Sequence, residues 1–194
     1  RPTTSRVREA VINILATRLS GCHWLDLCSG SGVMGCEALE RGAERVIAVE
    51  KDIKTAEVCK TNLAFTAEAN PQKSQIEVIR REVVSWLKEG CKRYNKKNHA
   101  GPNRSSCFSL IYLDPPYNSK LYLPILKALL EGNWLRKEAL VICEHASSQD
   151  LKPPKHWKTV SHRLYGQTSI LLITPQEVHF DDTDSKLKQI DLAK

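Results

Sequence analysis

Short apolar runs alternate with stretches of helical periodicity along most of the chain. The apolar runs predict strands at residues 24–28, 46–50, 76–79, 109–113, 139–143, 158–164 and 169–173. Apolar residues at three- and four-residue spacing predict helices at residues 7–19, 34–41, 53–65, 83–92 and 121–131. This alternation indicates an α/β fold: a doubly wound, Rossmann-like, seven-stranded and mostly parallel sheet with helices on both faces. We expect the last strand to be reversed, in a hairpin around Tyr165-Gly166.

The pattern predicts one domain over residues 1–174 and a polar C-terminal tail over residues 175–194. A stretch at about residues 90–106 mixes basic residues with Asn, Gly, Pro and Ser, and is expected to be a flexible basic loop. Its basic residues are Lys92, Arg93, Lys96, Lys97 and Arg104. Such a loop is either a solvated insertion or a contact for RNA.

The composition is that of an ordinary globular protein, 41% hydrophobic and 26% charged. No apolar run approaches the roughly 20 residues of a membrane-spanning helix, so no membrane partner is expected. The net charge of +7 favours a polyanionic partner and argues against an acidic tail protein. The sequence begins at Arg1 rather than at a methionine, so we expect a fragment or a processed form.

The seven cysteines are odd in number and form no CxxC pair. Several lie in apolar runs, where a reduced cysteine packs as a small hydrophobic residue. This usage favours a reducing, intracellular compartment over a secreted disulfide framework. Cys22, His23 and Cys28 match no zinc spacing, so no metal is expected.

A glycine loop, Asp26-Leu-Cys-Ser29-Gly30-Ser-Gly32, leaves the first strand and enters a helix. Its glycines allow close approach of a ligand, and the helix start offers unpaired N–H groups. Glu50 ends the next strand, where a carboxylate can bind both ribose hydroxyls. The glycine spacing alone also fits a nicotinamide dinucleotide. Asp26 argues against that ligand, because its charge would repel a pyrophosphate and attract an ammonium group.

The fourth strand leads directly into Asp114-Pro115-Pro116-Tyr117, at the carboxyl end of the sheet. The prolines carry no N–H, so the corner offers two acceptors, the Asp114 carboxylate and the Pro115 carbonyl. Two acceptors match the two hydrogens of an aromatic amine, and Tyr117 supplies a face on which an extruded base can stack. The alternative is a rigid turn that merely ends the strand.

The Asp-Pro-Pro-Tyr corner after such a loop resembles the amino-methyltransferases of the Rossmann-like class, which act on adenine N6, cytosine N4 or guanine N2. The opening Arg1-Pro-Thr-Thr-Ser-Arg6-Val-Arg8-Glu-Ala-Val-Ile-Asn-Ile-Leu is similar to the RsmD family, bacterial-type enzymes that methylate guanine N2 in small-subunit ribosomal RNA. The resemblance covers about residues 1–174. It extends through residues 26–43, 49–52, 62–63, 114–117 and 163–168.

This resemblance implies S-adenosylmethionine as cofactor, with contacts from the glycine loop (Asp26, Ser29, Gly30, Gly32) and from Glu50. It also implies an acidic residue after the third strand that binds the adenine amine. The family commonly has Asp-Ala there, whereas this chain has Glu82-Val83. Glu82 is therefore expected either to contact adenine or to cap the next helix. The N-terminal hairpin usual in the family would lie upstream of Arg1.

Four residues are candidates for contact with substrate RNA. Arg1, Arg6 and Arg8 lie in the opening segment that carries the resemblance, and the alternative for them is a solvated first turn of a helix. Tyr165 is placed to form a wall of the base pocket, and its alternative is a core aromatic of the hairpin.

We therefore predict an enzyme that transfers a methyl group directly from S-adenosylmethionine to the N2 amine of a guanine in small-subunit ribosomal RNA. Its partners would be ribosomal RNA or the assembling small subunit, and the protein is expected to be a monomer in a bacterial cytoplasm or a plant plastid. The first alternative is adenine N6 methylation of DNA or RNA. The others are a non-catalytic RNA-binding assembly factor with this fold and a nicotinamide oxidoreductase.

Overall fold

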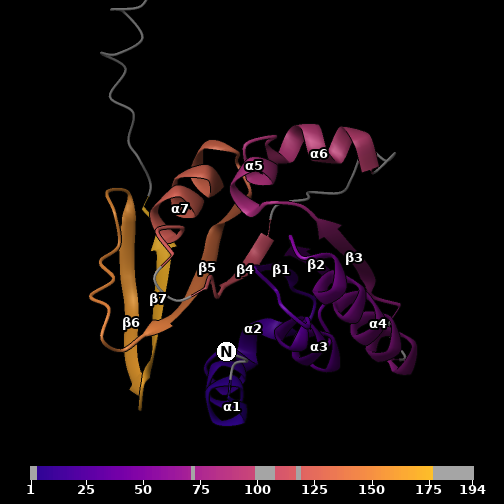
Figure 1. Cartoon of the computed structure of the whole chain (residues 1–194), viewed down its shortest axis with the longest axis horizontal. Helices are drawn as coiled ribbons and strands as arrows, with labels where there is room; N and C mark the ends of the chain where they lie inside the picture. Colours follow the sequence, from indigo (N-terminus) through magenta and orange to yellow (C-terminus); the bar gives the residue numbers. More distant parts are fainter. Residues whose placement is uncertain (1–3, 71–72, 99–107, 117–118, 177–194) are drawn as a thin grey trace, which may run out of the picture.

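Seven strands lie side by side in one sheet, in the order β3-β2-β1-β4-β5-β7-β6 (Figure 1). The computed structural model describes residues 4–70, 73–98, 108–116 and 119–176. The strands are β1 (His23–Leu27), β2 (Arg45–Glu50), β3 (Gln75–Arg80), β4 (Phe108–Leu113), β5 (Leu135–Ala146), β6 (Trp157–Tyr165) and β7 (Thr168–Pro175). The helices are α1 (Ser5–Ile14), α2 (Ala16–Leu19), α3 (Val33–Glu40), α4 (Ile53–Ala69), α5 (Val83–Leu87), α6 (Cys91–Asn98) and α7 (Tyr122–Glu131).

The strand directions confirm the predicted sheet. β1 pairs in parallel with both β2 and β4, and β3 and β5 extend the parallel part on either side. β7 runs antiparallel to β5 and to β6, so the last strand is the reversed one. Central β1 is fully buried, which is expected of a parallel strand covered on both faces.

Two helical layers cover the two faces of the sheet: α1 to α4 lie below it in Figure 1, and α5, α6 and α7 lie above. Successive residues of a strand point to opposite faces. Leu110 and Tyr112 of β4 therefore pack in the core under α1 and α3, and Ile111 and Leu113 pack in the core under α5 and α7. The carboxyl ends of the five parallel strands share one edge, where ligands bind in this architecture.

The helical prediction was wrong at two junctions. The helix expected over residues 7–19 is interrupted at Leu15, which links α1 to α2 with φ −94° and ψ 1°. The helix expected over residues 83–92 ends earlier, and Gly90 follows with φ 78° before α6 begins. Only glycine adopts this left-handed conformation at little cost, so the break is encoded in the residue itself.

The loop expected over residues 90–106 begins instead with a helix, α6, and this is a correction. Tyr94 is buried there, 5.5 Å from the ring of Trp86 and 5.7 Å from that of Trp134. A short polar helix is marginal alone, so this aromatic packing accounts for its formation. Residues 99–106, including Arg104, and most of the tail expected over residues 175–194 lie outside the described ranges.

Candidate active site

Three carboxylates gather where β1, β2 and β4 end. Asp26 of β1 is in register with Ala48 of β2 and Tyr112 of β4. Glu50 is the last residue of β2, and Asp114 follows β4, its N–H 3.4 Å from the Leu27 carbonyl oxygen. The parallel strands thus bring together three acids that are far apart in the sequence.

Asp26 is the buried member of this carboxylate group, with 2% of its surface exposed. Burial, followed by the negative charges of Asp114 and Glu50, raises the pKa of Asp26 well above the ordinary value. Its Oδ2 has no hydrogen-bond partner among the described residues. A buried, unpartnered acceptor next to two further acids favours a ligand that carries positive charge.

The glycine loop takes its shape from left-handed residues between β1 and α3. Cys28, Gly30 and Gly32 have φ of 60°, 54° and 76°. A Cβ on Gly32 would lie 2.6 Å from Cys59 Sγ, so this glycine allows α3 to begin directly against α4. A Cβ on Gly30 would meet no heavy atom within 4 Å. Gly30 therefore leaves open space next to the loop, which a ligand can occupy.

Ser29 is held by its backbone and directed toward α4. Its N–H donates to the Val49 carbonyl at 3.1 Å, which ties the loop to β2. Its hydroxyl lies 3.7 Å from Cys59 Sγ. The side chain therefore contacts the protein itself in this structure.

Glu50 connects the loop with the start of α4. Its Oε2 accepts a hydrogen bond from the Gly30 N–H at 3.0 Å, and its Oε1 accepts one from the Asp52 N–H at 2.9 Å. These bonds fix the carboxylate at the end of β2, beside the open side of the loop. That is the position from which a carboxylate binds ribose hydroxyls in this architecture.

The Asp-Pro-Pro corner follows β4 at the same edge. Asp114 is half-buried, Pro115 is buried and Pro116 is exposed. The Pro116 carbonyl accepts a hydrogen bond from the Ser119 N–H at 3.0 Å, which ties the corner to the segment before α7. Tyr117, the predicted stacking residue, lies outside the described residues.

Glu82 caps α5. Its carboxylate accepts hydrogen bonds from the Val84 N–H at 2.9 Å and the Ser85 N–H at 2.7 Å. Partial burial opposes ionisation, but these hydrogen bonds outweigh it and hold the pKa of Glu82 below the ordinary value. The capping role that the sequence left open is thus present, at the end of β3 and close in the sheet to Glu50.

The predicted RNA contacts differ in their surroundings. Arg6 is exposed on α1, whereas Arg8 forms an ion pair with Glu37 of α3, with 2.9 Å between Nε and Oε1. Tyr165 is half-buried and packs against the core on the α1 side of the sheet. Arg1 lies outside the described residues.

A polar cluster at the end of β5 was missed by the sequence reasoning. The Tyr112 hydroxyl donates to the Glu144 carboxylate, and the Tyr122 hydroxyl donates to the Glu144 carbonyl. Burial raises the pKa of Tyr122, so its hydroxyl stays protonated as a donor. Burial lowers the pKa of His145, whose ring stacks on that of His162 with centroids 5.6 Å apart. Glu144-His145 directly follows an apolar run, but the local sequence does not show that contacts from other elements bury these side chains.

The carboxylate group and loop suit S-adenosylmethionine, whose sulfonium and ammonium groups are cationic. Asp26 Oδ2 offers an unused acceptor, and Gly30 provides open space. A nicotinamide dinucleotide would place its negative pyrophosphate beside the same acids, which is unfavourable. Among the described residues, no group of three or more His, Cys, Asp or Glu side chains is arranged to hold a metal ion. No helix in the described ranges is long and apolar enough to span a membrane.

Comparison with known proteins gives a consistent match. Residues 1–174 match the family model described as "Conserved hypothetical protein 95". The chain is 31% identical over 172 residues to "Ribosomal RNA small subunit methyltransferase D" of Haemophilus influenzae, covering 89% of this chain and 81% of that protein. It is 28% identical over 185 residues to the protein of the same name from Escherichia coli, covering 95% and 84%. The solved structure of yhhF from Escherichia coli superposes with a TM-score of 0.73 at 26% identity, covering 91% and 89%.

Proposed function

Since the chain belongs to the family described as Conserved hypothetical protein 95, and is an RsmD-like methyltransferase, we propose that it methylates the N2 amine of a guanine in small-subunit ribosomal RNA. The names of the relatives support ribosomal RNA as the substrate class. The observation that carries the proposal is the Asp114-Pro115-Pro116 corner, which follows β4 beside the carboxylates of Asp26 and Glu50. It supports the proposal because the corner would offer two acceptors to an amine next to a site suited to a cationic cofactor.

S-adenosylmethionine would be held by the glycine loop (Asp26, Ser29, Gly30, Gly32), Glu50 and Glu82. When bound, it supplies a methyl group on a positively charged sulfur. Asp26 is suited to the ammonium and Glu50 to the ribose hydroxyls. Glu82 would contact the adenine amine only with the oxygen lone pairs that its capping bonds leave free. Ser29 would contribute chiefly through the backbone of the loop, because its hydroxyl faces Cys59.

Asp114 and Pro115 would orient the acceptor amine. The Asp114 carboxylate and the Pro115 carbonyl accept one hydrogen bond each from the two amine hydrogens, which turns the nitrogen lone pair toward the methyl carbon. As the new N–C bond forms and the C–S bond breaks, the nitrogen becomes positive, and the Asp114 carboxylate stabilises that charge. The nitrogen then loses one proton through Asp114 to solvent. Catalysis by these groups is positional and electrostatic and needs no covalent enzyme intermediate.

The remaining predicted residues would contact the RNA. Pro116 keeps the corner rigid, and Tyr117 would stack on the extruded base. Arg1 and Arg6 would contact phosphates. Arg8 would do so only in exchange for its ion pair with Glu37. Tyr165, on the α1 side of the sheet, would form part of the pocket wall.

The test is incubation of the protein with labelled S-adenosylmethionine and small-subunit ribosomal RNA or particles, followed by digestion to nucleosides. The expected product is N2-methylguanosine, absent with Asp114→Ala. Labelled N6-methyladenosine would mean that the protein methylates an exocyclic amine as proposed, but that its substrate base is adenine rather than guanine. RNA binding without label, despite measured cofactor binding, would favour a non-catalytic assembly factor. Elution as a single 21.9 kDa species in gel filtration would agree with the expected monomer.

The relatives named above come from bacteria, which supports a bacterial cytoplasm as the compartment of this reaction. None of them supports the plant plastid.

A further inference from the structure

α6 and the end of α5 present a basic surface that the proposed reaction does not use. We call it the α6 basic surface; it consists of Lys88, Lys92 and Arg93. All three side chains are exposed, and none forms an ion pair or hydrogen bond with a described residue. Exposed cations without acidic partners are available to a polyanion.

The charge is arranged on one side of an amphipathic helix. Cys91 and Tyr94 are buried against the aromatic residues beneath α6, while Lys92 and Arg93 face outward. The sequence continues with two further lysines at positions 96 and 97.

A hollow of about 350 Å³ adjoins these cations, lined by Lys88, Lys92 and Arg93 on one side and by Gly132 and Asn133 on the other. Two acids also line it, and both are already paired. Glu89 forms an ion pair with Arg81, and Glu131 lies 3.6 Å from the ammonium of Lys127. The uncompensated charge of the hollow is therefore positive.

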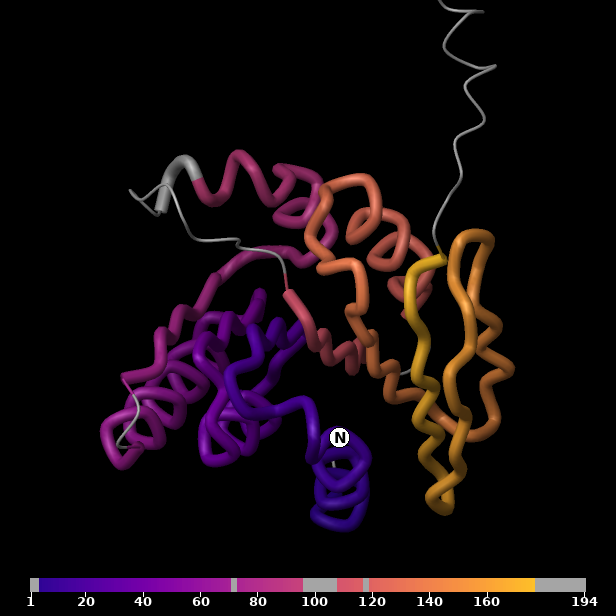
Figure 2. The backbone as a smooth tube through the Cα atoms, turned by 180° about the vertical axis from the view of Figure 1, so that it is seen from behind, coloured from indigo at the N-terminus to yellow at the C-terminus, as the bar shows by residue number. Residues whose placement is uncertain are grey.

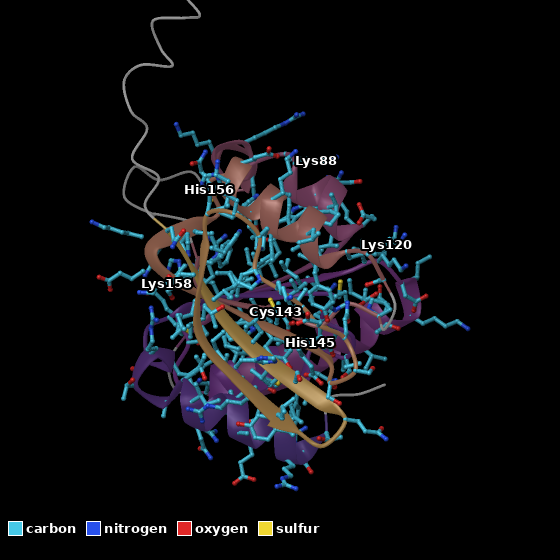
Figure 3. The ribbon with its side chains drawn as sticks, turned by 90° about the vertical axis from the view of Figure 1, so that its left-hand side faces the viewer. Lys88, Lys120, Cys143, His145, His156 and Lys158 are labelled. Atoms are coloured by element: carbon cyan, nitrogen blue, oxygen red, sulfur yellow. The ribbon has the colours of Figure 1, made fainter. Side chains whose placement is uncertain are left out.

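The α6 basic surface lies at the opposite end of the sheet from the Asp-Pro-Pro corner. The Cys91 N–H donates to the Gly132 carbonyl, and the Phe108 N–H donates to the Trp134 carbonyl, which places the start of α6 at the amino end of β4. Asp114 follows the carboxyl end. Since β4 has six residues, the two ends are about 20 Å apart at ~3.3 Å per residue. Figure 3 shows Lys88 near the top of the molecule and His145, which lies at the carboxyl end of β5, well below it near the centre. Figure 1 shows α5 between α6 and α7, and Figure 2 shows α6 on the side of the molecule away from the β6–β7 hairpin.

We propose that the α6 basic surface binds the phosphate backbone of the substrate RNA about 20 Å from the modified base. This inference rests on the proposed function for the identity of the RNA. It implies that the enzyme needs a structured RNA that spans both sites. At a rise of roughly 3 Å per nucleotide, this distance corresponds to about six or seven base pairs.

The test compares RNA binding by the variant K88Q/K92Q/R93Q with that of a matched control, K60Q/K73Q/K155Q. The control removes the same charge from exposed positions outside α6. The probes are a ribosomal RNA stem that extends beyond seven base pairs from the methylated nucleotide and a trimmed stem of about four base pairs. Binding is measured by fluorescence anisotropy between about 0.05 and 0.3 M salt, after thermal unfolding has shown that both variants are folded.

For the long stem, the α6 variant is expected to raise Kd at least about tenfold near 0.15 M salt and to reduce the slope of log Kd against log salt by about two to three. The short stem should bind the α6 variant and the wild type alike. The control should match the wild type on both probes. Equal losses in the α6 variant and the control, or an equal loss on short and long stems, would overturn the proposal.

The outcome is separable from that of the proposed function. Loss of long-stem affinity in a protein that transfers no methyl group would support the surface and reject the reaction. Guanine methylation with unchanged long-stem affinity in K88Q/K92Q/R93Q would support the reaction and reject the surface. A variant that loses binding only to vesicles of anionic phospholipid would identify a membrane contact instead, which also rejects the proposal.

Discussion

Replacing Asp114 with alanine distinguishes a role of its carboxylate in methyl transfer from a role in cofactor binding. The half-buried carboxylate would accept a hydrogen bond from the amine and stabilise the positive charge that develops on it during transfer. A hydrogen bond to a charged group contributes about 1.5–3 kcal/mol, and removal of one preorganised polar group typically costs about 10²–10³ in kcat. We therefore expect Asp114→Ala to lower single-turnover transfer by at least about 10²-fold.

Cofactor affinity should respond much less. After burial, the Asp114 charge contributes most to the raised pKa of Asp26, so its removal relieves repulsion and eases ionisation of Asp26. The easier ionisation of Asp26 favours binding of the cationic cofactor, which offsets part of the attraction for the sulfonium that is lost with the Asp114 charge. The dissociation constant should stay within about tenfold, a difference of about 1.4 kcal/mol.

The assay is rapid-quench transfer to RNA, with isothermal titration of the cofactor on the same preparations. Glu68→Ala, which removes an exposed carboxylate near the end of α4, is the matched control. Joint loss of transfer and cofactor binding would mean that Asp114 is structural. Undiminished transfer would mean that the amine is held elsewhere, and either result refutes the assignment.

Three further predictions concern the packing and charge of the site. Gly32→Ala should lower the free energy of unfolding by about 2 kcal/mol, because its Cβ would overlap Cys59 Sγ at a left-handed φ; urea denaturation measures this, and unchanged stability would contradict the packing. Asp26 has a raised pKa, so the folded protein binds the extra proton and stability should fall as pH rises above the ordinary carboxyl range. Asp26→Asn should flatten that fall and weaken cofactor binding, and parallel stability curves for the two proteins would refute the argument. Tyr122→Phe should cost about 1–2 kcal/mol, since the buried Glu144 carbonyl loses its donor, and an unaltered Tm would show that another group replaces it.

The acids of the site could be predicted from sequence because each lies at or near the carboxyl end of a buried strand. Asp26 is the last residue but one of β1, Glu50 ends β2 and Asp114 follows β4, and parallel strands bring such ends to one edge. The parallel strand directions could also be predicted, because strands and helices alternate along the chain. Periodicity and position were sufficient there, because burial on both faces leaves a strong pattern.

The polar cluster and α6 could not be predicted in this way. Glu144 and His145 are buried through contacts with Tyr112, Tyr122 and His162, which lie on other elements, so nothing in their local pattern distinguishes them from an exposed strand end. The helix α6 depends on Trp86 and Trp134, one on either side of it in sequence, for the packing of Tyr94. Tertiary contacts outweigh local composition in both cases.

The register of the central strands also bears on the order in which the site can form. β1 pairs with β2 through a short α3 connection, whereas its pairing with β4 joins Trp24 to Leu110, 86 residues further along the chain. Closure of so long a loop is slow compared with local pairing. During synthesis and folding, the residues proposed for the cofactor (Asp26, Gly30, Glu50) can assemble from a local unit, while Asp114 joins them only when β4 inserts. We expect transfer competence to appear last, so that a partly folded chain has no acceptor corner with which to modify RNA.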